Sequence, residues 1–234
     1  MFIFSFLKEK ILYAICLLFI FSYGCSSSGD FHIKNLAKTD IDDVSEIHMQ
    51  QVAFLLKNLT EKLYKKNPAE LKKNEGQTIE TRINRIFTCP PDRNIIELDN
   101  KDSSDAILLG FDPEYNGDRI FAMMYGLYTM IHKSYNSKCE LFIPDSLNEQ
   151  ALYNSARNIE IFVWRLSTRV KEDGQPLIFT NSLEGEVKNL SYERIFGKLI
   201  SLQDTMALIV SSKTGRIIKE VVLFTGMAFL PIGF

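Results

Sequence analysis

The chain of 234 residues is poor in the residue types that mark common enzymes and metalloproteins. Its histidines number three, and none forms the His pair around Glu at helical spacing that a zinc enzyme uses. It has no Gly-x-Ser-x-Gly elbow, and no glycine-rich phosphate loop that ends in Lys and Ser or Thr. The sequence therefore predicts no metal and no cofactor. Catalysis stays uncertain, and a non-catalytic role is favoured.

The chain also lacks a charge excess of one sign and a hydrophobic run of membrane-spanning length. With 27 basic and 29 acidic side chains it carries a formal net charge of −2, so nothing in it recruits nucleic acid. The uncharged runs 11–23 and 120–131 are both shorter than the roughly 20 residues that a helix needs to span a bilayer.

The N-terminal segment has the features of an export signal. A start that carries lysines leads into the short apolar run 11–23, and a small residue, Gly24, stands before Cys25. The tetrapeptide Ser22-Tyr23-Gly24-Cys25 resembles the lipobox of bacterial lipoproteins, in which the cysteine is acylated and becomes the first residue. Ser22 departs from the Leu, Val or Ile usual there. The alternatives are an ordinary secretory signal or an uncleaved anchor in which Cys25 is incidental.

The resemblance implies an address as well as an anchor. In that class, Asp directly after the lipidated cysteine retains the protein at the inner membrane, and here Ser26 follows instead. We therefore expect a signal peptide over 1–24 and an outer-membrane lipoprotein that faces the periplasm and meets the membrane through the acyl chains of Cys25. Residues 25–38 are small and polar and predict a flexible tether. The remaining 39–234 have the length of one domain.

Four cysteines reduce to two once this address is discounted, because Cys16 lies in the signal and Cys25 would be acylated. Cys89 and Cys139 remain. An oxidising compartment favours a disulfide between them, and closing such a loop would stabilise the fold by roughly 4 kcal/mol. The sequence leaves open a bonded pair or two separate thiols. Either thiol could in principle act with His132 as a nucleophile, although no local signature supports this.

Apolar residues at spacings of three and four predict a mainly α fold, with five to seven helices and minor β structure at most. The uncharged segment 120–131 is apolar on nearly every face and predicts a buried central helix. We expect a long connection over 87–117, a short strand at 177–180, and a last helical stripe that runs to Phe224 with Gly215 as a break. Further helix starts are expected at Thr39, Asn67, Ser146 and Ser191.

Two segments are candidates for a partner surface. Arg157, Trp164 and Arg165 lie on the most regular helical pattern, where they could form a binding face or an ordinary solvated one. The uncharged segment 221–234 could dock onto a partner or membrane, or fold back into the core.

The sequence thus predicts a lipid-anchored envelope lipoprotein with a non-catalytic binding or structural role, and another envelope protein as partner. The alternative is a periplasmic enzyme or small-ligand carrier whose polar residues converge only in three dimensions.

Overall fold

The computed structural model describes residues 40–142, 146–180 and 189–232, and these are mainly helical. They form seven α-helices and one 3-10 helix: α2 (Asp40–Lys66), α3 (Pro68–Leu71), α4 (Ile79–Ile86), η2 (Ile96–Leu98), α5 (Ser103–Phe111), α6 (Arg119–Ser134), α7 (Glu149–Thr168) and α8 (Ser191–Thr214). The mainly α prediction is confirmed. The strand expected at 177–180 is wrong, because the described residues hold only an isolated bridge between Val170 and Pro176.

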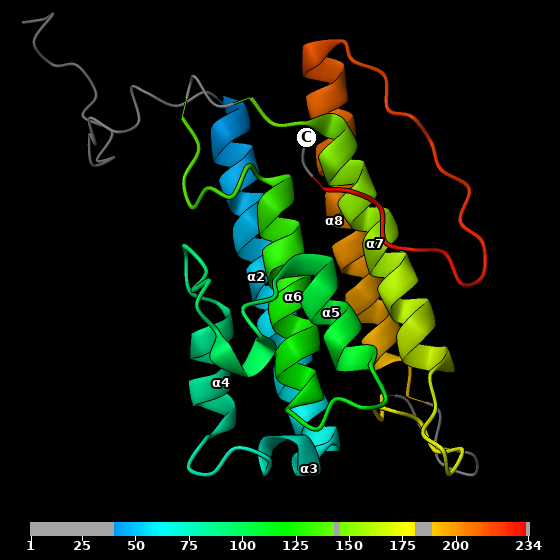
Figure 1. Ribbon diagram of the computed structural model, residues 1–234. Coiled ribbons are helices and arrows are strands. Elements are labelled where there is room, and N and C mark those ends of the chain that lie inside the picture. The colour runs from blue at the N-terminus through cyan, green and yellow to red at the C-terminus, as the bar shows by residue number, and fades with distance from the viewer. Residues whose placement is uncertain (1–39, 143–145, 181–188, 233–234) are drawn as a thin grey trace, which may run out of the picture. The chain divides into compact units, whose positions relative to one another are not determined.

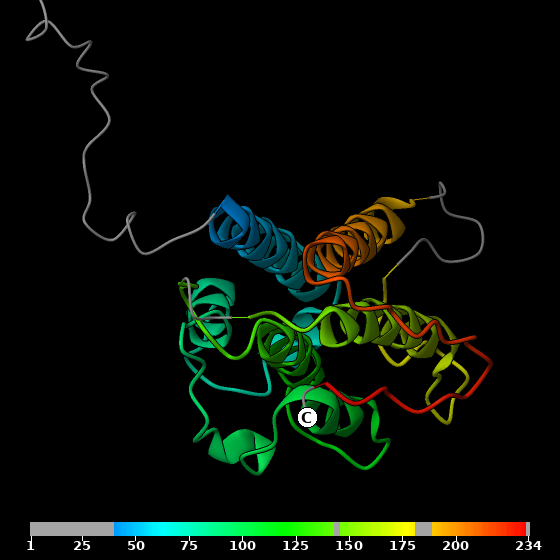
Figure 2. The same ribbon diagram turned by 90° about the horizontal axis from the view of Figure 1, so that it is seen from above.

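Four long helices form a ring in which neighbours run antiparallel (Figures 1 and 2). Helix α2 packs against α6 and α8, and α7 packs against the same two helices from the other side. Helix α5 lies along α6, and α4 contacts both α2 and α6. None of the described helices is both long enough and apolar enough to cross a membrane. The signal and tether expected over 1–38, including Cys25, lie outside the described residues.

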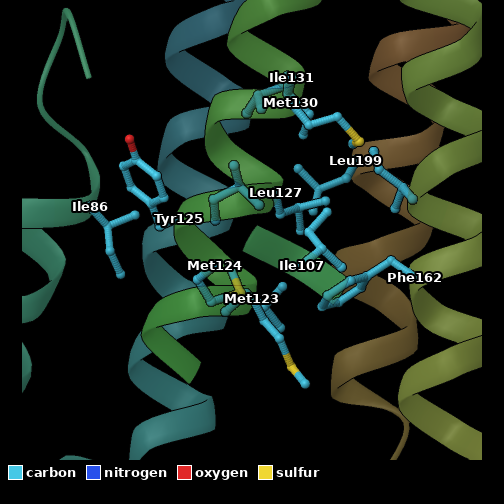
Figure 3. Close-up of a cluster of buried hydrophobic side chains, with 14 of the residues drawn as sticks. Ile86, Ile107, Met123, Met124, Tyr125, Leu127, Met130, Ile131, Phe162 and Leu199 are labelled. Carbon is cyan, nitrogen blue, oxygen red and sulfur yellow. The ribbon is translucent and has the colours of Figure 1, made fainter. Parts of the chain in front are cut away.

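Helix α6 is the centre of the fold, as its uncharged sequence predicts. Every residue from Arg119 to Leu127 is buried, so the helix contacts protein on all sides over more than two turns. Figure 3 shows its side chains pointing in opposite directions, with Tyr125 toward Ile86 of α4 and Met130 toward Leu199 of α8. The buried central helix is therefore confirmed.

Two glycines allow α5 and α6 to pack with almost no space between their backbones. A Cβ atom added to Gly126 would lie 2.6 Å from the carbonyl oxygen of Ser103 and 2.7 Å from the backbone nitrogen of Ile107. A Cβ atom on Gly110 would lie 2.6 Å from Cγ of Met123. These distances are below van der Waals contact, so a side chain at Gly126 would force the two backbones apart.

A buried charge network joins α6 to the helices around it. The Asp118 carboxylate accepts hydrogen bonds from the backbone N–H of Phe121, the hydroxyl of Tyr64 and Nε of Arg82. Arg82 also forms a two-armed ion pair with Glu97, and its guanidinium lies 3.7 Å from the centroid of the Phe121 ring. Burial raises the pKa of Asp118, whereas the hydrogen bond from Phe121 and the charge of Arg82 lower it. Every member of this network is partnered, which indicates a structural role.

The expected long connection over 87–117 is wrong in one respect, because it contains η2 and the nine-residue helix α5. The apolar piece 106–111 is the second part of that helix. Its first turn is the polar Ser103-Ser104-Asp105, which is typical of a loop as well as of a helix start. The sequence pattern alone therefore does not separate the two.

Helix ends also differ from the predicted ones. Asn148, rather than Ser146, caps α7, and its side chain accepts a hydrogen bond from the N–H of Ala151. Asn67 makes no cap contact, and the helix after it has only four residues. Helix α8 ends at Thr214 because Gly215 takes a left-handed conformation with φ of 70°. The predicted helical stripe is therefore wrong beyond Gly215, and Phe224 lies on a segment that is not helical.

Candidate functional site

The first candidate site lies where the loop after α4 meets the end of α6. Cys89 and Cys139 form a disulfide there, one of the two arrangements that the sequence left open, with a Cα–Cα distance of 5.8 Å. The Nε2 atom of His132 is 3.4 Å from Sγ of Cys89. The fold thus brings together the two cysteines and the histidine that the sequence suggests as a possible thiol nucleophile with its histidine. In the disulfide neither sulfur is a thiol, so neither is a nucleophile in this state.

His132 is buried, and this sets its protonation. Burial and the charge of Arg93 lower its pKa, and a hydrogen bond with the backbone of Lys138 opposes them. At neutral pH the ring is therefore neutral. The Nε2 atom of this ring is the one that faces Sγ of Cys89.

A small pocket of about 200 Å³ opens beside this group and has a mostly apolar lining. Helix α2 supplies Met49, Gln50, Val52 and Ala53, and helix α6 supplies Tyr128, Ile131 and His132; Phe87, Cys89, Tyr135, Lys138 and Cys139 complete the lining. The pocket is smaller than the roughly 300–1,000 Å³ of typical small-molecule sites. It could admit water, an ion or a small apolar molecule.

The second candidate site is the outer side of α7, where Arg157, Trp164 and Arg165 were expected to form a partner face. Arg157 is paired with Asp204 of α8 at 2.7 Å and with Glu160 at 3.2 Å. Arg165 donates a hydrogen bond to the carbonyl of Met227 and stacks 5.3 Å from the Phe229 ring. Both guanidinium groups therefore hold parts of this chain together. The expectation that they contact a partner stays a prediction.

Both figures of the whole chain show the segment after α8 running beside α7, in orange to red (Figures 1 and 2). We call residues 216–232 the tail. Its backbone is held by amide side chains of α7, two of which contact a tail residue on both its N–H and its C=O. Gln150 bonds Lys219 in this way, and the buried Asn158 bonds Leu230 at 2.6 and 2.9 Å. Such a side chain replaces the partner strand that an extended segment usually needs.

A third amide of this kind lies elsewhere in the bundle. Asn67, at the end of α2, accepts a hydrogen bond from the N–H of Phe179 and donates one to its carbonyl, both at 2.8 Å. Sequence reasoning assigned Asn67 to a helix cap because Asn is a favoured capping residue. Its actual role depends on a residue 112 positions away, which local sequence does not indicate.

The tail alternates between residues that face α7 and residues that face solvent. Val221 and Leu223 are partly buried, whereas Val222 and Phe224 are 87% and 69% exposed. Phe224 also lines a hollow of about 260 Å³ between the tail and α7. The other residues around that hollow are Glu160, Ile161, Trp164, Leu223, Thr225 and Met227. We call this surface, from Trp164 to the outward side chains of Val222 and Phe224, the tail face.

Comparisons with known proteins gave no relative. No family model, no curated protein and no solved structure matches the chain.

Proposed function

We propose that this chain is a lipid-anchored envelope lipoprotein that acts by binding another protein through the tail face. One observation carries the proposal: the tail is fixed in place while two of its apolar side chains, Val222 and Phe224, point outward. Two hydrogen bonds each to Gln150 and to Asn158 hold the backbone at its two ends. Between those ends, Val222 and Phe224 are exposed. The surface is already formed, so binding would order few further residues.

The energetics of the tail face favour association. Burying a Val or Phe side chain against a partner contributes roughly 1.5–3 kcal/mol, so Val222 and Phe224 together could supply much of a moderate affinity. The half-buried Trp164, which lines the same hollow as Phe224, is of the residue type most enriched at the centre of interfaces.

The tail backbone points to the chemistry of the partner. Lys219 and Val221 use their N–H groups toward α7, to Gln150 and to the hydroxyl of Tyr153. Because successive residues of an extended segment point to opposite sides, the backbone groups of Glu220 and Val222 face away from α7. None of the backbone–backbone hydrogen bonds among the described residues involves Glu220 or Val222. An extended apolar segment of a partner protein would satisfy these groups by strand addition.

The lipid anchor limits where the partner can be. The chain between Cys25 and Asp40 spans at most about 50 Å when fully extended. A domain anchored by the acyl chains of Cys25 would therefore stay close to the membrane surface, where another envelope protein is the expected occupant. Two or more acyl chains are needed for stable anchoring, and lipidated Cys25 would supply them.

The partner surface can be tested by placing a photo-crosslinking amino acid at Val222 of the protein in its native cells. Ile96 is the matched control, because it is also a β-branched apolar residue and is 84% exposed against 87% for Val222. We expect one discrete protein adduct from position 222 and none from position 96. Equal and diffuse adducts from both positions, or adducts with lipid alone at position 222, would contradict a protein partner.

The anchor is tested separately by labelled palmitate. The wild-type chain should incorporate the label and the Cys25→Ala variant should not. Label that persists in Cys25→Ala would overturn the lipoprotein assignment without affecting the tail face, so the two parts of the proposal can fail independently.

The pocket beside His132 supports a second candidate function, that of a small-ligand carrier. Its apolar lining and single buried imidazole suit a small aromatic molecule with one hydroxyl group. Phenol is a suitable probe. Saturable shifts in the NMR signals of Tyr128 and His132 would support a carrier, and shifts that rise linearly to millimolar phenol without saturation would count against it.

A further inference from the structure

We propose that Cys89, His132 and Cys139 form a binding site for a thiolate-preferring divalent cation of the zinc class once a dithiol reductant opens the disulfide. The two sulfurs and the imidazole each offer one ligand atom, and these atoms all lie within 4.8 Å of one another. No zinc motif in the sequence indicates this set, because His132 and Cys139 are 43 and 50 positions from Cys89. Zinc motifs are recognised by much shorter ligand spacings.

The position of the imidazole already fits metal coordination. Tetrahedral zinc has Zn–S bonds of about 2.3 Å and Zn–N bonds of about 2.0 Å, which places the two ligand atoms about 3.5 Å apart. The Sγ atom of Cys89 and the Nε2 atom of His132 are 3.4 Å apart. A cation could therefore join these two atoms with little movement of either side chain.

The surroundings of His132 resemble the outer shell of a metal ligand. A ligating histidine usually donates its other N–H to a carbonyl or carboxylate, which fixes the ring and points the lone pair at the metal. His132 has a hydrogen bond with the backbone of Lys138, and its Nε2 faces the sulfur. The histidine lies in the last turn of α6, the central helix, so its backbone position is fixed by the core.

Access and coordination number also suit a cation. Cys89 and Cys139 are both exposed, and all three residues line the same small pocket. Three protein ligands leave a fourth tetrahedral position, which water from the pocket can fill. The buried side chain in the group is the imidazole, and the two that a reductant must reach are on the surface.

The reaction balances in two steps. A dithiol transfers two electrons and two protons to the Cys89–Cys139 disulfide, which gives two thiols and a new disulfide in the reductant. The cation then binds both sulfurs and the neutral imidazole, and the two thiols release two protons. The oxidised protein has no thiolate, so the site binds the cation only in the reduced state.

The experiment uses the full chain in detergent with Cys16→Ser and Cys25→Ser, so that Cys89 and Cys139 are its remaining cysteines. The protein is reduced, freed of reductant without oxygen and titrated with Co²⁺ as a spectroscopic probe. We expect a thiolate-to-cobalt absorption band and tetrahedral ligand-field bands that saturate at one equivalent and disappear on addition of Zn²⁺. The disulfide form should show neither band.

His132→Ala is expected to weaken Co²⁺ binding at least tenfold, because a direct ligand is lost. His48→Ala is the matched control, since His48 is also partly shielded from solvent but is outside the ligand group, and its affinity should be unchanged. Equal affinity in the wild-type protein and His132→Ala, or binding without a thiolate band, would overturn the proposal. If His132→Ala fails to fold, the ¹¹³Cd NMR shift of the cadmium-loaded wild-type protein is used instead, because it reports the ligand atoms of the metal. We expect two sulfur ligands and one nitrogen ligand, and any other ligand set would contradict the site.

Discussion

The centre of the bundle and the tail are held in place by different kinds of contact. Around α6, apolar side chains and two glycines fill the space, and the charged residues within it pair with one another. Along α7, the tail has partly buried side chains on one side only, and amide groups fix its backbone. The centre is therefore filled by its own side chains from Arg119 to Leu127, whereas the tail presents apolar surface to other molecules. Stability is expected to concentrate in the first region and binding in the second.

The largest expected effect is on the buried charges of the centre. Arg82→Met removes the cation that faces Asp118, and the two side chains are 1% and 0% exposed. Leaving a carboxylate uncompensated in the interior costs about 3–5 kcal/mol. The free energy of unfolding, measured by urea denaturation, should fall by that amount. Arg85→Met is the control, because Arg85 is 43% exposed and its ion pair is with the partly exposed Glu97, so its loss should stay below about 1 kcal/mol. Similar losses in both variants would contradict the structural role of the network.

The second effect tests the close packing of α5 on α6. Gly126→Ala places a methyl group against the backbone of α5 and should lower the free energy of unfolding by about 1–3 kcal/mol. Gly197→Ala in α8 meets nothing within 4 Å and should be neutral or stabilising by up to about 1 kcal/mol, because alanine favours a helix. If thermal unfolding shows the same shift for both variants, the two helices are not in close contact.

The third effect tests how the tail is held. Asn158→Ala leaves the N–H and C=O of Leu230 without partners and should cost about 1–3 kcal/mol. Limited proteolysis should then cut the tail before the bundle. Gln150→Ala removes the matching bonds to Lys219 at a more exposed position and should cost less. Proteolysis that begins in the bundle of Asn158→Ala would show that the tail is not a separately held segment.

The smallest effect is a pH dependence at the centre's edge. Burial lowers the pKa of His132, so between its ordinary pKa and the lower folded value only the unfolded chain binds the proton. Stability from this group is present above the ordinary pKa of about 6.5 and is lost as pH falls below it. His132→Gln should lose less stability than the wild-type protein between pH 7.5 and pH 5.5, measured by urea denaturation. Equal losses in the two proteins would mean that His132 does not contribute.

The sequence predicts the centre well and the tail poorly, for physical reasons. The segment 120–131 is uncharged and apolar on nearly every face, so only burial on all sides removes its apolar surface from water. Its pattern alone therefore indicates the central helix. The tail is also apolar, yet its pattern does not show whether Phe224 continues a helix or faces solvent. That outcome depends on Gly215 and on the amide of Asn158, which is 72 positions from Leu230.

The candidate sites show the same limit. Cys89 and Cys139 could be named as a pair by elimination, because Cys16 lies in the expected signal peptide and Cys25 is the residue expected to be acylated. Their proximity to His132 could be raised but no local signature supported it, since it depends on how the end of α6 meets the loop after α4. Arg157 and Arg165 were recognisable as charges on one helix. That each contacts another part of the same chain depends on α8 and the tail.

The central claim is that the tail is fixed on α7 and presents a formed surface. Amide hydrogen exchange of the free protein, followed by NMR, tests it most directly. The N–H groups of Lys219, Val221 and Leu230 donate to α7 side chains and should be protected, whereas that of Val222 should exchange at nearly the rate of an unstructured peptide. Unprotected exchange at all four amides would contradict the account, because the tail face would then not exist in the free protein.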